Sequence, residues 1–242
     1  MGSIRRSEFE SLMDILQPNA QYNLAKPDTL AARVMSHARR RMYERFIRST
    51  GIQVGESLLD VGVTSDQSYE HSNYVEAWYP YKDKITAVGI DDASFLERLY
   101  PGLVYRRANG LELPFAVDSF DVVHSSAVLE HVGNVENQRR FVTELTRVAR
   151  RAVFLTTPNR WFPVEFHTIL PLVHWLPKPW FRGLLRNTRY QFFSREENLN
   201  LLARDELLEL CSGLTGCAVA AQSQRLLGMT SNLLLIIHKG HK

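Results

Sequence analysis

The chain has 242 residues, enough to bury one sizeable core without a second domain. Its 29 Lys and Arg nearly balance its 26 Asp and Glu, which excludes a protein that binds nucleic acid mainly through net charge. No apolar run approaches the ~20 residues of a membrane-spanning helix, and two cysteines without a signal peptide indicate reduced thiols. We therefore expect one cytoplasmic domain over residues 1–242 that binds no nucleic acid.

Residues 1–50 are expected to form a helical segment ahead of the main fold. Apolar residues at helical spacing predict a short helix over 7–17, which Pro18 ends. A longer helix follows and ends at Gly51; it mixes a narrow apolar stripe with many arginines. We expect it to lie across a sheet edge with its arginines outward. The arginine run at 39–41 is typical of a solvated helix face, with a phosphate or membrane site as the alternative.

From residue 57 onward, strand-like runs alternate with helix-like runs. The strand-like runs are short and apolar on both faces, as in a sheet that helices cover on both sides. This alternation predicts an α/β fold, a doubly wound, Rossmann-like parallel sheet. The expected strands are 58–61, 85–90, 103–106, 120–125 and 152–156, and the expected helices are 72–79, 93–100 and 135–150.

Residues 158–193 interrupt this alternation. They hold three of the four tryptophans and several closely spaced prolines, which favours a lid-like insertion. Ser194 and Glu197 have the spacing of a capping box, so we expect a helix from there to about Cys211. Two β-rich runs joined at Gly228 then predict an antiparallel hairpin at the edge of the sheet.

Doubly wound sheets bind ligands beyond the carboxyl ends of their strands, and four stretches of this sequence fall there. The first is the turn at Asp60 and Gly62, where a residue without a side chain lets the backbone approach a ligand. The second ends at Asp91, whose carboxylate can accept both hydroxyls of a ribose, with Asp92 beside it. The first stretch therefore predicts a close approach to a ligand, and the second predicts contact with a ribose.

The third and fourth stretches follow the next two strands. Asn109, Gly110 and Leu111 lie where an adenine ring could be sandwiched and its amino group bonded. The fourth stretch, "FDVVHSSAVLEHVGN", ends a strand with the small residues Ser125 and Ser126 and then turns toward a Glu-His pair. We expect all of these residues to line one cofactor site.

Taken in order, "LDVG", "GID", "LPF…SFDVV…LEHV" and "TPN" resemble the class I S-adenosylmethionine-dependent methyltransferases that act on small molecules, over about residues 57–159. The resemblance implies S-adenosyl-L-methionine as the cofactor, and the final hairpin agrees with the family's seventh, antiparallel strand. It assigns the methionine part of the cofactor to the loop at Asp60 and Gly62, the ribose to Asp91 and the adenine to Asn109.

The first loop has fewer glycines than is usual in that family, because Thr64 and Asp66 stand at the later positions. S-adenosylmethionine has no pyrophosphate, so its site does not require the backbone amides that cradle anionic oxygens in a dinucleotide site. Thr64, Ser65 and Asp66 can instead bond its amino and carboxylate groups. Two alternatives are an inactive, methyltransferase-like binding or regulatory protein and a nicotinamide-dependent reductase whose ribose Asp91 would hold.

The resemblance predicts methyl transfer to a small molecule or to a glycan- or lipid-linked acceptor, by O-methylation. A base helps to remove a hydroxyl proton, and His131 in "LEHV" is the first candidate, with a purely structural histidine as the alternative. Some quinone O-methyltransferases hold a divalent metal with such a Glu-His pair and a Glu three residues earlier. Ala127 occupies that earlier position here, so we expect no metal.

The second candidate base is His167, within the insertion. Asn159, Arg160 and Glu165 lie near it in sequence and are predicted to bind the acceptor beside an aromatic wall. The alternative is a lid that packs on the sheet, with structural histidines. The aromatic and arginine-rich insertion also suggests peripheral contact with a membrane that carries a lipid-linked acceptor.

Overall fold

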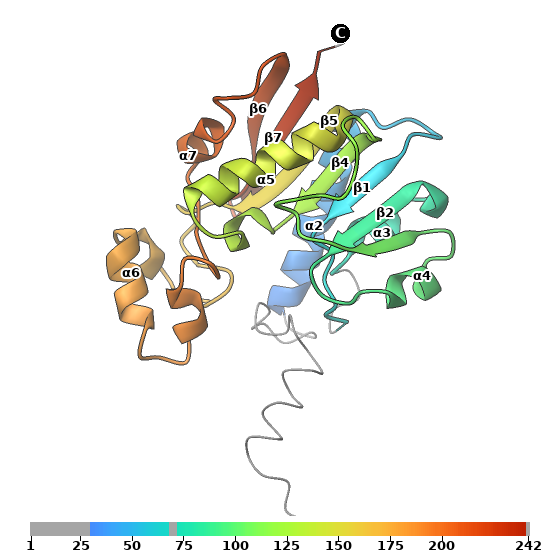
Figure 1. The fold of residues 1–242 in the computed structure, drawn as a ribbon. Coiled ribbons are helices and arrows are strands. Elements are labelled where there is room, and N and C mark those ends of the chain that lie inside the picture. The colour runs from blue at the N-terminus through green and yellow to red at the C-terminus, as the bar shows by residue number, and fades with distance from the viewer. Residues whose placement is uncertain (1–29, 68–71, 241–242) are drawn as a thin grey trace, which may run out of the picture.

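The computed structural model describes residues 30–67 and 72–240, and the predicted helix over 7–17 lies outside them. Seven strands form one sheet in the order β3-β2-β1-β4-β5-β7-β6, with helices on both faces (Figure 1). The strands are β1 (Leu58–Val61), β2 (Ile85–Gly89), β3 (Val104–Arg107), β4 (Phe120–Ser126), β5 (Ala149–Pro158), β6 (Cys217–Leu226) and β7 (Met229–Lys239). The predicted α/β fold and all of its expected strands are confirmed.

The helices alternate with the strands as the sequence pattern predicted, although several are shorter than expected. The α-helices are α2 (Leu30–Thr50), α3 (Tyr74–Trp78), α4 (Phe95–Leu99), α5 (Val135–Val148), α6 (Lys178–Leu185) and α7 (Arg204–Glu209). Short 3-10 turns are η2 (Lys82–Lys84), η3 (Leu129–His131), η4 (Val173–Trp175) and η5 (Gln191–Ser194). No helix in the described ranges is long and apolar enough to cross a lipid bilayer.

β1 to β5 run parallel, and β7 lies antiparallel between β5 and β6. The predicted hairpin is therefore present, with its second strand on the inside. Ala152 pairs with His238 and Pro158 with Asn232 along this junction. Since the parallel strands all point the same way, the ends of β1, β2, β3, β4 and β5 meet at one edge of the sheet.

Two apolar clusters form the core, one on each face of the sheet, because successive side chains of a strand point to opposite faces. Leu59 and Val61 of β1 pack with Phe141 of α5, while Leu58 packs with Phe46 of α2 on the other face. Asn134 caps α5 by accepting a hydrogen bond from the Asn137 backbone at 2.9 Å, an interaction worth ~1 kcal/mol. α5 fixes the chain that follows β4.

α2 lies across the face of the sheet, which corrects the expectation that it would lie at an edge. Its buried Phe46 meets His124 of β4 at 4.9 Å and Phe154 of β5 at 5.6 Å between ring centroids. Both strands belong to the middle of the sheet. Arg40 and Arg41 are exposed, as the predicted solvated face requires.

The helix predicted from Ser194 is wrong. Ser194 ends η5, and the next helix is α7, whose Glu206 side chain accepts a hydrogen bond from the Ala203 backbone at 2.7 Å. Residues 196–198 form a turn, and residues 199–202 are buried without forming a helix: the Asn200 backbone donates to Glu130 O at 2.7 Å, and Leu202 O accepts from Arg160 N at 3.0 Å. These tertiary contacts override the local capping signal.

The insertion with α6 lies to one side of the sheet (Figure 1), and it packs around an apolar cluster of its own that includes residues of α6. Its chain leaves the sheet after β5 and returns where Asn159 bridges to Leu202. The packing extends past the predicted end at residue 193. The cluster consists of Phe181, Leu185, Tyr190, Phe193, Leu199 and Leu201.

Candidate functional site

The turn after β1 is packed against the neighbouring strand ends. The backbone N–H groups of Gly62 and Val63 both donate to Val88 O of β2, at 2.7 and 3.0 Å. Gly62 has φ +103°, and a Cβ built on it would lie 2.1 Å from Cγ2 of Val128, which follows β4. Only glycine fits this position, so the loops after β1, β2 and β4 converge on it.

The loops after β2 and β3 close around the same point. A Cβ on Gly89 would lie 2.8 Å from Val63 O and 3.6 Å from Asp91 O. A Cβ on Gly110 would lie 3.2 Å from Cγ1 of Val61. The structure thus brings together the four stretches that the sequence placed at one edge of the sheet. We call this meeting point of the loops the crevice, after the place beyond the carboxyl ends of the strands where doubly wound sheets bind ligands.

Asp91 and Asn109, which the sequence predicts to contact the nucleoside, follow the ends of β2 and β3. Asp91 is half-buried directly beyond β2. Asn109 is exposed; its Oδ1 accepts a hydrogen bond from the Leu111 backbone at 2.9 Å, which orients the amide and keeps its NH2 group a donor. Asp92 acts differently. It is exposed and accepts from the Ser94 backbone at 2.9 Å, and these hydrogen bonds from Ser94 lower its pKa at the start of α4.

The polar residues of the first loop are held by the chain that leads into α3. Thr64 N donates to Asn73 Oδ1 at 2.9 Å, and Asn73 Nδ2 donates back to Thr64 O at 3.0 Å. Thr64 Oγ1 accepts from the backbone of Asp66 at 3.0 Å. Ser65 is half-buried between them. These bonds order the loop without the additional glycines that are usual in the family.

Ser125 and Ser126 join strand ends. Ser125 is fully buried and donates to Val61 O at 2.7 Å. The Ser126 hydroxyl lies 2.8 Å from that of Thr156 in β5. Both serines therefore tie β4 to its neighbours below the crevice, which is a supporting role for residues predicted to contact the cofactor.

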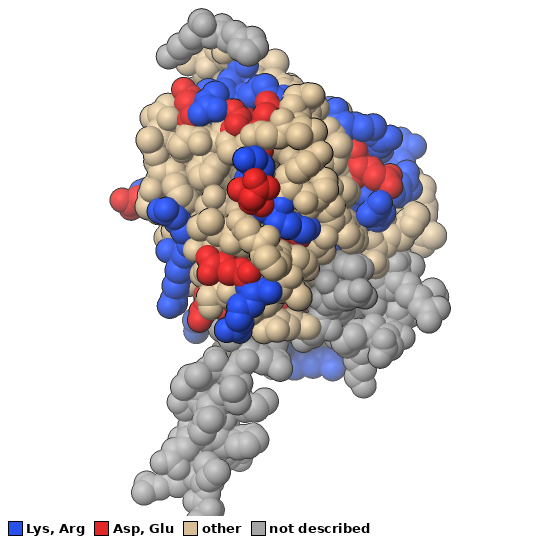
Figure 2. Space-filling view, turned by 90° about the vertical axis from the view of Figure 1, so that its right-hand side faces the viewer, with Lys and Arg blue, Asp and Glu red and all other residues tan. Residues whose placement is uncertain are grey.

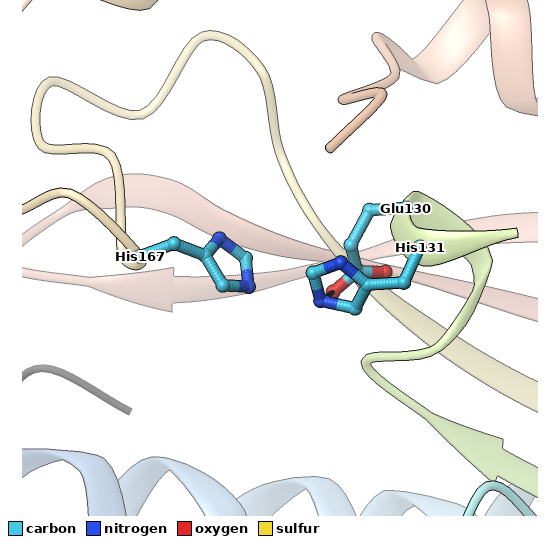
Figure 3. A group of neighbouring side chains, drawn as sticks. All are labelled: Glu130, His131 and His167. Atoms are coloured by element: carbon cyan, nitrogen blue, oxygen red, sulfur yellow. Dashed lines mark ion pairs between the residues drawn. The ribbon is translucent and has the colours of Figure 1, made fainter. Parts of the chain in front are cut away.

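Beyond β4, the consecutive residues Glu130 and His131 face His167, which is distant from them in the sequence (Figure 3). Glu130 and His131 come from η3, and His167 comes from the insertion; we call them the Glu130 cluster. The two imidazole rings are 4.7 Å apart between centroids and nearly perpendicular, and Glu130 Oε1 lies 3.9 Å from His131 Nε2. The two histidines that the sequence offered as separate candidates thus form one site.

Each member of the Glu130 cluster is oriented by a further group. His167 Nδ1 donates to Glu165 Oε1 at 2.6 Å, and His131 Nδ1 donates to Asn198 O at 2.7 Å. Thr157 Oγ1 donates to the other carboxylate oxygen of Glu130, Oε2, at 2.9 Å. Since both histidines donate through Nδ1, their Nε2 atoms carry the lone pairs in the neutral form.

Burial shifts the protonation of these groups in opposite directions. It raises the pKa of Glu130 to about 7 and, together with the charge of His167, lowers the pKa of His131 to about 3. Burial would also raise the pKa of Glu165, but the His167 charge and hydrogen bonds lower it to about 2. Burial opposes the charging of His167, yet the carboxylate of Glu165 raises its pKa overall. The cluster is neutral at His131 and basic at His167.

Asn159 and Arg160, predicted to bind the acceptor, are occupied inside the protein. Asn159 Nδ2 donates to Thr230 O at 2.9 Å. The Arg160 guanidinium donates to Leu176 O at 3.2 Å and lies 5.1 Å from the Trp161 ring, with 14% of its side chain exposed. Asn159 thus connects the insertion to β7, and Arg160 connects two parts of the insertion.

A hollow of about 450 Å³ among the described residues lies elsewhere. It is lined by Tyr43 and Ile47 of α2, by Val54 before β1 and by Tyr81 before β2. These residues mark the amino ends of the strands, on the far side from the crevice. The hollow is not part of the candidate site.

Comparisons with known proteins agree with this geometry. Residues 59–156 match the family model described as "Methyltransferase domain". Residues 59–156 are therefore similar to a methyltransferase domain, and the fold is that of the class I methyltransferases. The predicted resemblance to the S-adenosylmethionine-dependent methyltransferases is confirmed over these residues. No curated protein matches the sequence of the chain.

Solved structures resemble the methyltransferase domain in fold at low sequence identity. The [4+2]-cyclase SpnF is 13% identical with a TM-score of 0.61, over 100% of this chain and 99% of that one. Magnesium protoporphyrin IX methyltransferase from Synechocystis PCC 6803, with bound SAH, is 13% identical with a TM-score of 0.57, over 97% and 95%. The CurJ carbon methyltransferase is 14% identical with a TM-score of 0.55; this chain spans 59% of its length, and 97% of this chain is covered.

Asp60 of the methyltransferase domain is a buried support of the first turn. Its Oδ1 accepts from His124 Nδ1 at 2.7 Å, and His124 Nε2 lies 2.9 Å from the Tyr74 hydroxyl. Burial lowers the pKa of His124 to about 4 and raises that of Asp60 to about 7, with the carboxyl of Glu76 close by. The Asp60 side chain points to the α2 and α3 face, so the backbone of this turn, and not its carboxylate, faces the crevice.

Sequence reasoning missed the residues that orient the Glu130 cluster. Thr157 and Asn198 lie on separate segments, and their pairing with η3 is set by tertiary packing. Asn200 and Gln138 complete the support: Gln138 Nε2 donates to Leu129 O at 3.1 Å and Asn200 Nδ2 donates to Gly133 O at 2.9 Å. Buried amides beside a Glu-His pair are the signal that could have indicated a constrained turn.

Proposed function

We propose that this methyltransferase domain is an active enzyme that transfers a methyl group from S-adenosylmethionine to a hydroxyl of a small or lipid- or glycan-linked acceptor. The observation that carries the proposal is the convergence of four loops around Gly62, with the Glu130 cluster directly beside it. Val128, which packs on Gly62, precedes Glu130 by two residues in the same turn. A cofactor crevice and a polar reaction site therefore adjoin.

The crevice fits the cofactor in the chemistry of its groups. Asp91 offers two acceptor oxygens for the ribose hydroxyls, and Asn109 offers an amide for the adenine edge. Gly62 is exposed and has no side chain, so its backbone can approach the cofactor closely. S-adenosylmethionine, when bound, supplies a methyl group on a positively charged sulfur that a nucleophile displaces in line.

His167 is the residue best suited to take a proton from an acceptor hydroxyl. Glu165 holds its Nδ1–H, which leaves Nε2 as the basic atom and directs it toward His131 (Figure 3). Glu165 is itself buried and fully occupied by His167 and the Thr168 backbone, so it is a positioning residue and does not bind the acceptor. His131, with its lowered pKa, serves as a neutral acceptor of hydrogen bonds.

Features outside the crevice support a small or lipid-linked acceptor. On the face shown in Figure 2, Lys and Arg are interspersed with Asp and Glu, a distribution that does not favour a polyanion. Trp180 and Leu184 of α6 are 69% and 57% exposed and share one side of that helix. Arg186 and Arg189 follow them and are exposed. This combination suits peripheral contact with an anionic membrane.

Calorimetric titration with S-adenosylhomocysteine tests the cofactor proposal. We expect saturable binding, reduced at least tenfold by Asp91→Asn because one ribose acceptor loses its charge. Asp83→Asn is the matched control, since Asp83 is exposed at the opposite end of β2. Tighter binding of NAD than of S-adenosylhomocysteine would favour the reductase alternative.

Transfer of a labelled methyl group tests activity. Hydroxyl-bearing acceptors, soluble and vesicle-borne, are incubated with labelled S-adenosylmethionine, and the product is located on oxygen by hydrolysis. Cofactor binding without transfer to any acceptor would favour a binding or regulatory protein. SpnF, named as a cyclase, shows that this fold is also associated with other chemistry.

A further inference from the structure

The Glu130 cluster has the composition and the support of a metal site. Glu130, His131 and His167 each offer one ligand atom, and these atoms lie within 4.8 Å of one another. Two imidazoles and one carboxylate are a common ligand set for divalent transition metals, with remaining positions open to water or substrate. Sequence reasoning expected no metal because Ala127 replaces one acidic ligand, and it did not foresee that His167 would join the pair.

The carboxylate of Glu130 points to a missing partner. The residue is fully buried, and its Oε1 has no hydrogen-bond partner among the described residues, whereas Oε2 is held by Thr157. A buried, unpaired carboxylate oxygen carries a large desolvation cost. It lies 3.9 Å from His131 Nε2, a separation that one cation between them would bridge.

The groups around the cluster are those that orient metal ligands. Histidine ligands usually donate their second N–H to a carboxylate or a backbone carbonyl, which fixes the ring and increases its basicity. His167 donates Nδ1–H to Glu165 and His131 donates Nδ1–H to Asn198 O. Both Nε2 atoms therefore face the cluster with their lone pairs. The ligands need to move together only slightly, since tetrahedral ligand atoms at Zn²⁺ bond lengths are ~3.4 Å apart.

We propose that Glu130 Oε1, His131 Nε2 and His167 Nε2 bind one divalent transition-metal ion of the Zn²⁺ class. The site is reachable because 15% of the His131 side chain and 9% of the His167 side chain are exposed. Resting on the proposed function, the ion would lie on the acceptor side of the crevice. There it would bind the acceptor hydroxyl and lower its pKa, which would replace proton removal by His167, whose Nε2 is then a ligand. The proton leaves to solvent, the acceptor oxygen forms a bond to the methyl carbon, and the bond from that carbon to sulfur breaks to release S-adenosylhomocysteine. Metal binding itself needs neither cofactor nor acceptor.

Titration of the chelator-treated, tag-free protein with Zn²⁺ and with Co²⁺ tests the proposal, by calorimetry and by the visible absorption of bound Co²⁺. We expect one ion per chain. His167→Ala and the nearly isosteric Glu130→Gln should each weaken binding at least tenfold. His174→Ala is the matched control: His174 is a buried histidine of the same insertion, with Nε2 donating to Phe162 O at 2.7 Å.

The two variants keep the test decisive if one of them unfolds. Glu130→Gln preserves volume and can still accept from Thr157, and circular dichroism confirms its fold. Absence of binding to the wild type, or binding undiminished in a folded variant, would overturn the metal site. Both titrations omit S-adenosylhomocysteine, and cofactor binding is measured separately in chelator. Failure of the metal site is therefore distinguishable from failure of the methyltransferase proposal.

Discussion

At the scale of single residues, two carboxyl groups are buried near the turn at Gly62, those of Asp60 and Glu76. Glu76 is fully buried, and neither of its carboxylate oxygens has a hydrogen-bond partner among the described residues. Burial raises its pKa well above the usual range, and the charge of Asp60 raises it further. The carboxyl of Glu76 therefore keeps its proton to a higher pH than the carboxyl of an exposed glutamate does.

Replacing Glu76 with Gln should make stability less dependent on pH. Because the folded state holds its proton more tightly than the unfolded chain, the wild type is stabilised at low pH. It loses that contribution as the pH rises above about 4.5 toward the raised pKa, at about 1.4 kcal/mol per pH unit for one group. In urea unfolding from pH 5 to pH 8, the free energy of unfolding of Glu76→Gln should increase relative to that of the wild type as the pH rises. Glu136→Gln, at a side chain that is 79% exposed, should show no such trend.

Gly62→Ala should destabilise the protein by at least ~2 kcal/mol, since it combines a strained φ with a collision against Val128. Cofactor binding should fall with it, because the turn must move. Gly51→Ala isolates the φ contribution, since Gly51 has φ +56° and nothing within 4 Å of its Cβ position. Adding Val128→Ala should restore part of the lost free energy of unfolding; no recovery would mean that the collision is not the cause.

At the scale of elements, the strands could be predicted from the sequence, whereas the contacts between distant segments could be predicted only in part. Asp91 and Gly62 could be placed together from sequence because the carboxyl ends of parallel strands share an edge. The contact of His131 with His167 could not, since it depends on how the insertion folds back over η3. The helix expected from Ser194 failed for the same reason: burial of Leu199 and Leu201 decided the conformation there, and local spacing did not.

The β6–β7 hairpin offers a stabilising substitution. Leu227 and Gly228 form its two-residue turn with φ values of +51° and +82°, and Leu227 is 86% exposed. A left-handed, exposed leucine is unfavourable, whereas Asn-Gly is preferred in such turns. Leu227→Asn should raise the free energy of unfolding by ~0.5–1 kcal/mol in a denaturant titration, and Gly228→Ala should lower it. A loss of stability in Leu227→Asn would show that the leucine makes contacts outside the described residues.

At the scale of the whole molecule, the insertion packs around its own small apolar core, which is separate from the two clusters of the sheet. Arg186, Asn187, Thr188 and Arg189 are all exposed between α6 and η5. Among the described residues, brief trypsin digestion should therefore cut first at Arg186 or Arg189 and leave the sheet intact, because regions with few buried contacts open most readily. Mass spectrometry of the early fragments provides the measurement. Earlier cleavage at Arg139 or Arg140 in α5 would contradict this order of stability.

The exposed apolar side of α6 gives a test of membrane contact. Substituting Trp180 and Leu184 with Ser should lower co-sedimentation with anionic vesicles severalfold, since buried aromatic and aliphatic area drives such binding. Val54→Ser is the control, because Val54 is 75% exposed but lies at the amino ends of the strands. Equal co-sedimentation of all variants would remove the membrane from the proposal and leave a dissolved acceptor.

The position of β7 between β5 and β6 has a consequence for biosynthesis. β5 lacks its neighbour on that side until Met229–Lys239 has been translated, and β6 cannot join the sheet without the same segment. A nascent chain emerging from the ribosome thus exposes the backbone edge of β5 until that segment has followed it. Completion of the native sheet is delayed until after β7 leaves the exit tunnel, and during that interval a chaperone would have an unpaired strand to protect.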